Sequence, residues 1–417
     1  MHKNVLIQVL RIIPFRNLWF AQVVTQIVVN MLIFVLGVVI YETTASNTAV
    51  SVLYIAVGIP AAIFGIISGV FVDRLPKKGL LISTVFVRAG LVLLLVFSRG
   101  HLTTLYVIAA LISIVGQFFI PAEAALIPHF VRRELLLPAN SLFTMTFYSA
   151  IIGGFVAGGP LLDLLGWQTL LILLVGAFVA AGVLLLFLPR EPFLPSAQQL
   201  SFTTVLNDLR AGINFIYKTI RVREAITLLL LAQAVIAIFA SLGPGFADRI
   251  LYIKLTDASI LILGPAALGM ICGAIFISQV KSRFSRRKLI TASIIASGLL
   301  FMLVASLAAS SRYDLPRVIN VGILPIAIAS FFCLGFANSL IDVTCNTILQ
   351  EQTQEHMRGR VYGVLASLIG GVAILPVFVS GLLADTWGVG TVVFCLGLGL
   401  AGLGILIGKF HHEVVAH

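Results

Sequence analysis

The stretch GVFVDRLPKKG, residues 69–79, places one acid and three bases within six positions: Asp73, Arg74, Lys77 and Lys78. Long apolar runs lie on both sides of it. The whole chain of 417 residues is 60% hydrophobic and only 10% charged, and its mean hydropathy is +1.11. Soluble domains have about a quarter of their residues charged. We therefore interpret this stretch as a polar connection between two apolar segments.

The apolar segments have the length that crosses a bilayer as a helix, about 20 residues. Twelve of them follow one another along the chain and are separated by short charged segments. They cover residues 17–41, 49–72, 79–98, 103–127, 141–163, 167–188, 225–247, 259–280, 289–310, 321–346, 361–384 and 388–408. The sequence predicts an all-α membrane protein with twelve transmembrane helices.

The distribution of basic residues predicts the orientation of these helices. The net charge of +11 and the pI near 9.8 are also typical of nucleic-acid-binding proteins. With both termini in the cytoplasm, however, 21 of the 27 Lys and Arg residues lie in cytoplasmic segments, five lie outside, and Arg88 lies within a span. This asymmetry is the positive-inside rule, so no nucleic-acid partner is expected. We predict a multi-pass protein of a bacterial inner (cytoplasmic) membrane or a plasma membrane, with residues 17–41 retained as a span.

The sequence also argues against a metal site, ATP-driven transport and catalysis. The four cysteines, Cys272, Cys333, Cys345 and Cys395, all fall within predicted spans and lack the spacing of metal ligands. No phosphate-binding loop of the form G-x-x-x-x-G-K-[ST] is present, which argues against ATP as the energy source. We expect no catalytic residues, no metal and no cofactor, and hence no enzyme.

The longest polar interruption, residues 189–224, divides the spans into six and six. The predicted domains are an N-terminal bundle (1–188), a cytoplasmic linker (189–224) and a C-terminal bundle with a short tail (225–417). Apolar residues recur at helical spacing from Phe202 to Ile220 beside several bases, which predicts an amphipathic helix on the anionic cytoplasmic leaflet.

The two halves also resemble each other. GIISGVFVDRLPKK in the second span matches GMICGAIFISQVKSRFSRRK in the eighth, with Gly65 and Gly69 aligned to Gly269 and Gly273. Parallel repeats of six spans are a recurrent plan of transporters, in which the substrate site lies at the interface of the halves. We therefore predict two pseudo-symmetric six-helix bundles.

Longer motifs make the resemblance specific. The glycines followed by DRLPKK resemble the signature loop between spans two and three of the major facilitator superfamily. GQFFIPAEAALIPHFVRRELLLPANS (116–141), LNDLRAGINFIYKTIRVREAITLLLL (206–231) and RGRVYG (358–363) are similar to the branch of macrolide-efflux proteins and siderophore exporters, which are drug:proton antiporters. AGGPLLDLLGW (157–167) matches the antiporter motif of the fifth span only in part, because Asp163 stands where that motif has glycine.

Polar residues recur at helical spacing within the first, fourth and tenth spans, and the seventh offers only Gln233. A polar side chain in hydrocarbon is costly, so we expect these residues to face the bundle interior. The resemblance implies that spans one, four, seven and ten line the cavity, and the helical spacing supports this independently. The predicted cavity-lining residues are Gln22, Gln26, Asn30, Ser113, Gln117, Gln233, Asn338, Asp342 and Asn346. The alternative is that they form hydrogen bonds between helices, with no cavity.

Three ionisable residues within the spans have different predicted roles. Arg88 and Glu123 are expected at similar depths and are predicted to form an ion pair within the N-terminal bundle, although Glu123 is also a candidate for proton coupling. Asp342 has no Lys or Arg in any C-terminal span to pair with. It is therefore the main candidate for proton or cation binding. The alternative is that Asp342 lies in water at the cytoplasmic end of its span.

The opening stretch has a predicted function of its own. In the family that the chain resembles, the acid of this loop latches the two halves together on the cytoplasmic side. Here the partner of Asp73, next to Arg74, would be Arg358 or Arg360 at the start of the eleventh helix, helped by the positive end of that helix. A local pairing of Asp73 with Lys77 or Lys78 is the alternative.

The sequence thus predicts a monomeric secondary transporter that exports amphipathic small molecules, of a drug or macrolide-like kind, by alternating access in exchange for protons. Its partners would be the substrate, the proton and membrane lipids. Two other functions are open: a lipid or lysophospholipid flippase, and a transport-inactive receptor or assembly partner with the same fold.

Overall fold

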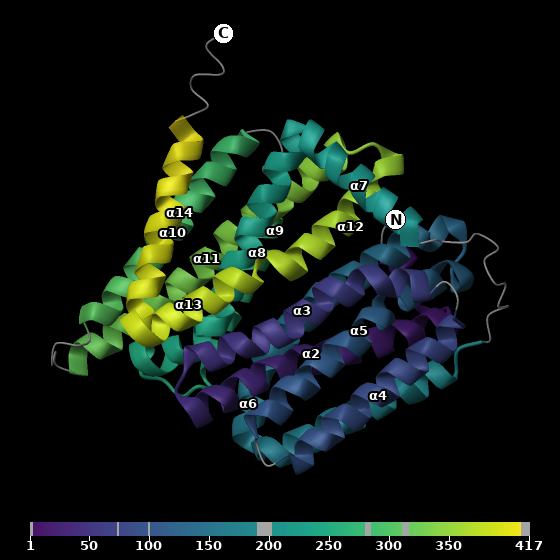
Figure 1. The fold of residues 1–417 in the computed structure, drawn as a ribbon, viewed down its shortest axis with the longest axis horizontal. Helices are drawn as coiled ribbons and strands as arrows, with labels where there is room; N and C mark the ends of the chain where they lie inside the picture. The colour runs from purple at the N-terminus through teal and green to yellow at the C-terminus, as the bar shows by residue number, and fades with distance from the viewer. Residues whose placement is uncertain are drawn as a thin grey trace, which may run out of the picture. The chain divides into compact units, whose positions relative to one another are not determined.

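The computed structural model describes residues 3–72, 75–98, 101–189, 202–279, 285–310 and 317–409, and within these ranges the chain is almost entirely helical (Figure 1). The elements before the linker are α1 (Lys3–Leu10), α2 (Ile13–Thr44), α3 (Asn47–Val72), α4 (Lys77–Phe97), α5 (Leu102–Phe130), the 3₁₀ turn η1 (Arg133–Leu135) and α6 (Leu136–Leu186). They are followed by α7 (Phe202–Lys218), α8 (Ile220–Phe246), the π-helical turns η2 (Ala247–Leu251) and η3 (Ser259–Leu263), α9 (Gly264–Gln279), α10 (Arg286–Ser310), α11 (Arg317–Gln352), α12 (Glu355–Val372), α13 (Ile374–Trp387) and α14 (Val389–Lys409).

Eleven helical segments of the described chain are long and apolar enough to cross a membrane. One of them contains α6, which runs for 51 residues and turns sharply at Gly166, where φ is 72° and ψ is 166°. Residues other than glycine are strained at such a φ. The turn falls between the predicted spans 141–163 and 167–188, so α6 comprises two of them. The predicted class, an all-α protein built from membrane-length helices, is confirmed.

The eleventh predicted span, 361–384, is divided between two helices. α12 ends at Val372 and α13 begins at Ile374. Pro376 follows at once, and because proline has no N–H it cannot donate a hydrogen bond to the carbonyl of Val372. Pro376 thus lies in the first turn of α13, where its missing N–H is tolerated.

The chain consists of two compact units, each of which is described separately. Unit 1 comprises residues 1–39 and 55–208, and unit 2 comprises residues 40–54 and 209–417. The turn between α2 and α3 therefore packs with unit 2, whereas most of both helices packs in unit 1. The domain limits 1–188, 189–224 and 225–417 stay a prediction.

Small residues allow the helices within each unit to approach closely. In unit 1, a Cβ at Gly154 of α6 would lie 3.0 Å from the Cβ of Asn30 in α2. In unit 2, a Cβ at Gly273 of α9 would lie 2.7 Å from the carbonyl oxygen of Phe336 in α11. Both contacts are too short for any larger side chain, so the glycines set the spacing of these helix pairs.

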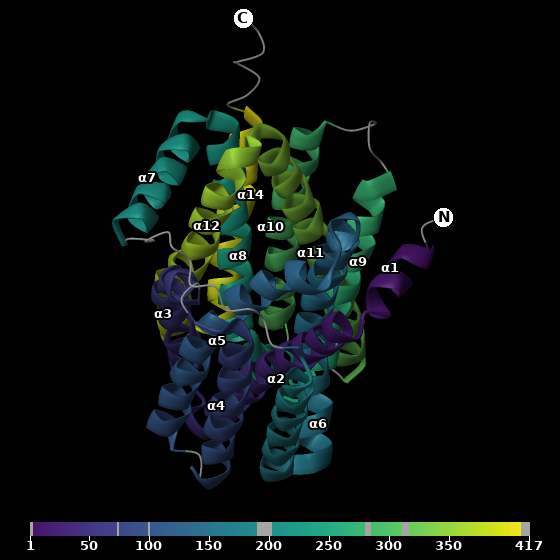
Figure 2. The same ribbon diagram turned by 90° about the vertical axis from the view of Figure 1, so that its right-hand side faces the viewer.

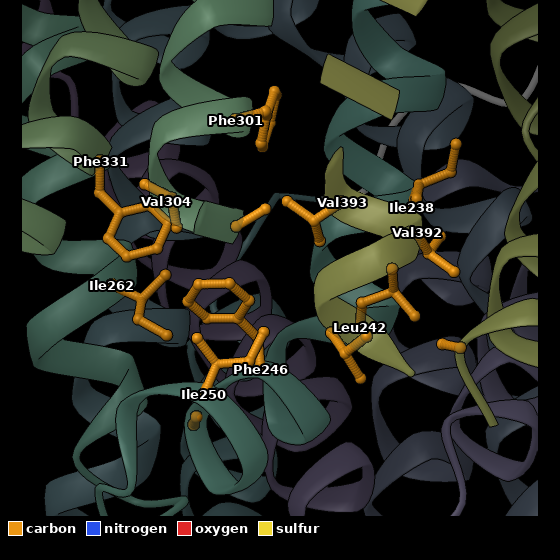
Figure 3. Close-up of a cluster of buried hydrophobic side chains, with 14 of the residues drawn as sticks. Ile238, Leu242, Phe246, Ile250, Ile262, Phe301, Val304, Phe331, Val392 and Val393 are labelled. Carbon is orange, nitrogen blue, oxygen red and sulfur yellow. The ribbon is translucent and has the colours of Figure 1, made fainter. Parts of the chain in front are cut away.

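The core of unit 2 combines aliphatic side chains with the rings of Phe246, Phe301 and Phe331 (Figure 3). Phe246 at the end of α8 lies 5.8 Å from Phe331 of α11, measured between ring centroids, in an edge-to-face arrangement. Phe239 contacts Phe246, Phe331 and Phe301 at 5.4–5.6 Å. Aromatic pairs at such distances contribute about 0.5–1.5 kcal/mol each beyond the burial of their area. This cluster ties α8, α10 and α11 together.

The linker contains the predicted amphipathic helix, α7, which lies beside α12 (Figure 2). A Cβ at Gly212 would be 3.0 Å from the carbonyl oxygen of Arg360, so α7 rests directly on the backbone of α12. The outward face bears Ile213 and Tyr217, which are 55% and 73% exposed. Contact of this face with the membrane surface stays a prediction.

Candidate functional site

Gln22, the first residue of the polar stripe on α2, faces α6. Gln22 is 3% exposed, and its Nε2 donates to the carbonyl oxygen of Phe143 at 3.4 Å. Its Oε1 accepts from Thr146, whose hydroxyl oxygen also accepts from the indole N–H of Trp19 at 3.0 Å. Gln26 and Asn30 are partly buried further along α2. At Gln22 the stripe thus stabilises the contact between α2 and α6.

The two polar residues of α5 face α3. The hydroxyl of Ser113 donates to the carbonyl oxygen of Val57 at 2.7 Å. Gln117 Oε1 would lie 3.4 Å from a Cβ at Gly65. Both side chains are partly buried. They lie along one line of contact between α3 and α5 within unit 1.

The stripe of α11 is the most polar of the four. Asn338, Asp342 and Asn346 recur every four residues and are all partly buried, as is Gln233 on α8. Asn346 Nδ2 donates to the carbonyl oxygen of Asp342 at 3.0 Å. Within the described ranges no Lys or Arg forms an ion pair with Asp342. Its carboxyl group is therefore an ionisable group in a membrane-length helix with amides as its neighbours on the same face.

Arg88 of α4 and Glu123 of α5 are buried together in unit 1, with exposures of 7% and 5%. They attract each other electrostatically, but no direct ion pair within 4.0 Å joins them in the described part of the chain. The guanidinium of Arg88 lies 5.8 Å from the ring centroid of Phe119 and presses against Gly116. Arg88 Nε and Glu123 Oε1 have no hydrogen-bond partner among the described residues. Two opposite charges thus share an enclosed space between α4 and α5.

Of the four predicted latch residues, the structure describes Arg358 and Arg360. Asp73 and Arg74 lie outside the described residues. Arg358 donates from its guanidinium to the carbonyl oxygens of Gln350 at 3.1 Å and Thr353 at 3.4 Å, and so caps the C-terminal end of α11. Arg360 contacts the sulfur of Met357 at 3.6 Å. The latch stays a prediction.

Sequence analysis missed a polar cluster at the turn between α2 and α3. The carboxylate of Asp385, on α13, accepts hydrogen bonds from the backbone N–H groups of Asn47 at 2.8 Å and Thr48 at 3.0 Å. It also accepts from the side chains of Ser46 at 2.6 Å, Asn47 at 3.0 Å and Thr48 at 2.7 Å. These are the first N–H groups of α3, which have no partner within their own helix. Asp385 therefore caps α3 from a helix more than 300 positions away in sequence.

Further contacts hold the same turn within unit 2. Arg249 donates to the carbonyl oxygen of Ala45 at 2.6 Å, and the Tyr41 hydroxyl donates to the carboxylate of Asp248 at 3.2 Å. Gly381 faces the turn, where a Cβ would lie 3.0 Å from the Cβ of Ser51. The sequence signalled only that Ser46 and Asn47 are residue types that begin helices. Nothing in it pointed to Asp385 as their partner.

Groups of three or more His, Cys, Asp or Glu residues that could hold a metal ion do not occur within the described ranges. The described membrane-length helices do contain amides such as Gln26 and Asn338, the carboxyl group of Asp342, and the buried pair Arg88 and Glu123. Such residues inside membrane spans are typical of substrate and ion pathways.

Comparison with known proteins agrees with this architecture. The chain is 26% identical over 384 residues to an uncharacterised MFS-type transporter, YfiS of Bacillus subtilis (strain 168), covering 90% of this chain and 88% of the relative. It is 24% identical over 388 residues to the multidrug efflux pump Tap of Mycolicibacterium fortuitum, covering 88% of each.

Among solved structures, the nucleoside transporter NupG superposes with a TM-score of 0.73 at 16% identity, covering 95% of this chain and 99% of NupG. A POT family transporter in complex with 5-aminolevulinic acid superposes with a TM-score of 0.71 at 13% identity, covering 96% of each chain. These likenesses concern the fold. The sequence profile of the Major Facilitator Superfamily matches residues 18–376. The chain is therefore a multi-pass membrane transporter that belongs to the major facilitator superfamily.

Proposed function

We propose that this transporter exports amphipathic small molecules by alternating access, in exchange for protons that bind at Asp342. The observation that carries the proposal is the carboxylate of Asp342 on α11. It is partly buried, it is flanked by Asn338 and Asn346 on the same face, and it has no ion pair within the described residues. A carboxyl group in this setting can exchange its charge for a bound proton, as the acids of pumps and transporters do.

The direction of transport rests on one relative and on the resemblance of the sequence motifs. Tap is a multidrug efflux pump, and its similarity covers 88% of this chain. Efflux pumps of broad specificity bind molecules with apolar bodies and few polar groups, which suits spans that offer isolated amides such as Gln26, Asn30 and Gln233. We further propose a bacterial cytoplasmic membrane, both termini in the cytoplasm and a monomer as the working unit.

The test is the accumulation of a fluorescent lipophilic cation in cells that lack their own efflux pumps. We expect cells expressing the chain to accumulate less dye than cells with an empty vector, and a protonophore to abolish the difference. Asp342→Asn should accumulate as much dye as the empty vector. Glu134→Gln, which neutralises an exposed acid of η1, is the matched control and should behave as the unaltered chain.

Three outcomes would overturn parts of the proposal. Export that keeps its dependence on the proton gradient in Asp342→Asn would remove Asp342 from the coupling mechanism. No export by protein that is folded in the membrane would favour a lipid substrate, and lysophospholipid translocation in vesicles would then be measured. Absence of flux for both substrate classes would favour a receptor or assembly partner.

A further inference from the structure

Unit 2 contains a cavity of about 960 Å³ between α8, α10, α11 and α14. This volume is at the upper end of the range for ligand pockets, about 300–1,000 Å³. Its polar wall comes from the first turn of α8, the start of α10 and the last turn of α11, and consists of Arg221, Arg223, Glu224, Ser285, Arg286, Arg287, Glu351 and Gln352. The remaining wall is apolar except for Thr227 and Thr291.

The cavity changes from charged to apolar along its length. On α8 the lining runs from Arg221 to Leu231, ten positions further along the helix, which is about 15 Å at 1.5 Å per residue. On α14 the lining includes Leu403 and Leu406. Leu406 is 51% exposed, so the apolar wall is open toward the side of the helices. An occupant would therefore need a charged head and an apolar body, and could enter from the hydrocarbon of the membrane.

The charges at the polar end favour an anion. Arg286 donates to both carboxylate oxygens of Glu351, with Nη2 to Oε1 at 2.9 Å, and Arg287 is attracted to Glu224. Each of these two acids thus has one arginine.

Two arginines remain at this end of the cavity. Arg221 and Arg223 have no carboxylate partner within the described residues, and the guanidinium of Arg223 stacks 5.5 Å from the ring centroid of Tyr217. Guanidinium groups bind phosphate through paired hydrogen bonds, so these two are free to hold a phosphate group.

Most of the cavity lining points away from the polar stripes that are expected to line the transport pathway. At about 100° per residue, Glu224, Leu228 and Leu231 point about 140–180° away from Gln233 around α8. On α11, Ile348 and Glu351 point about 120° and 180° away from Asp342. Arg223, Ala225 and Gln352 point only about 80° away from Gln233 or Asp342, so the two faces adjoin at these residues.

We propose that this cavity binds an anionic phospholipid of the bilayer, with its phosphate on Arg221 and Arg223 and its acyl chains along Leu228, Leu231 and Leu406. Basic pockets between transmembrane helices on the cytoplasmic side are typical sites for anionic headgroups. The lipid would hold the ends of α8 and α14 together, whatever molecule the protein transports.

The test is the unfolding temperature of the full chain in a neutral detergent during titration with three probes. Phosphatidylglycerol should raise it with a saturating dependence. Phosphatidylcholine with the same acyl chains and glycerol 3-phosphate without acyl chains should not. An equal rise in unfolding temperature with both lipids would show that the charge of the lipid headgroup does not determine binding, which contradicts the proposal. Saturation by glycerol 3-phosphate would show an anion site that needs no lipid.

Variants locate the site. Arg221→Gln and Arg223→Gln should each weaken phosphatidylglycerol binding about fivefold, which corresponds to about 1 kcal/mol per basic residue near a membrane surface. Arg132→Gln, at an exposed base of unit 1, is the matched control and should bind as the unaltered chain. Leu406→Asn keeps all four arginines and should also weaken binding. Unchanged affinity in the double variant Arg221→Gln/Arg223→Gln, shown to be folded, would overturn the proposal.

Discussion

The carboxylate of Asp385 on α13 caps α3 by accepting the backbone N–H of Asn47 at 2.8 Å. A second backbone N–H and three side chains bind the same carboxylate. A helix N-terminus concentrates unpaired N–H groups and positive potential, so an acid at this position stabilises it. The relationship joins the beginning of α3 to unit 2.

Replacement of Asp385 should loosen this turn. We expect Asp385→Ala to lower the free energy of unfolding by about 1–2 kcal/mol, the usual effect of losing a cap. Hydrogen exchange of the amides of Asn47 and Thr48 should become faster. Thr386→Ala is the matched control, because the Thr386 hydroxyl donates only to Leu382 and Leu383 of its own helix. Unchanged exchange in Asp385→Ala would mean that the turn is held by its other contacts.

The position of the Arg88 guanidinium depends on the absence of a side chain at Gly116. A Cβ at this glycine would occupy the place of the guanidinium. Gly116→Ala should therefore destabilise the protein by about 1–3 kcal/mol, as overpacking does. The control is Gly90→Ala on α4, where no atom lies within 4 Å of the new Cβ. Alanine is a better helix former than glycine, so Gly90→Ala should be neutral or stabilising. The measurement is the unfolding temperature of Gly116→Ala and of Gly90→Ala, each compared with the unaltered chain. Equal effects would show that Arg88 can move aside without loss.

Arg88 and Glu123 should act as a unit in stability. Neutralising either one leaves the other charge buried, which we expect to cost about 3–5 kcal/mol. The double variant Arg88→Gln/Glu123→Gln should be less destabilised than the sum of the single variants, as measured by a double-mutant cycle of unfolding free energies. If Glu123→Gln folds and loses transport while Arg88→Gln keeps transport, Glu123 belongs to proton coupling and the pair is the wrong interpretation.

The predicted cytoplasmic latch can be tested by crosslinking. In a background in which the four native cysteines are replaced, cysteines at positions 73 and 360 should crosslink when the cytoplasmic side is closed and separate when it opens. The matched pair is 73 and 358, which should react less because position 358 points about 160° away from position 360 around α12. Equal crosslinking under inward-facing and outward-facing conditions would rule out the latch.

Much of the fold could be predicted because the length of an apolar segment and the residues that end it are local properties of the sequence. The break between the predicted spans 141–163 and 167–188 falls at Gly166, and the start of the second span, predicted at 49, lies close to Asn47. Both signals are present in the sequence itself.

Partners across helices could not be predicted in the same way. Spacing of four residues shows that Gln22 and Asn30 share a face, but not that Gln22 meets Phe143 and Thr146. The cap at Asp385 depends on a contact between residues 338 positions apart. The lipid cavity depends on four helix ends that meet only in the folded unit 2.

Residues 40–54 have a consequence for any attempt to divide this protein. They belong to unit 2 by their packing although they precede most of unit 1 in the chain. A C-terminal fragment made alone from residue 209 would lack this turn and would leave Gly381, Arg249 and Asp385 without the surface that they contact. If the two halves were co-expressed as separate fragments, residues 40–54 of the N-terminal fragment would have to pack into unit 2 of the C-terminal fragment. The N-terminal fragment would thereby complete the fold of unit 2.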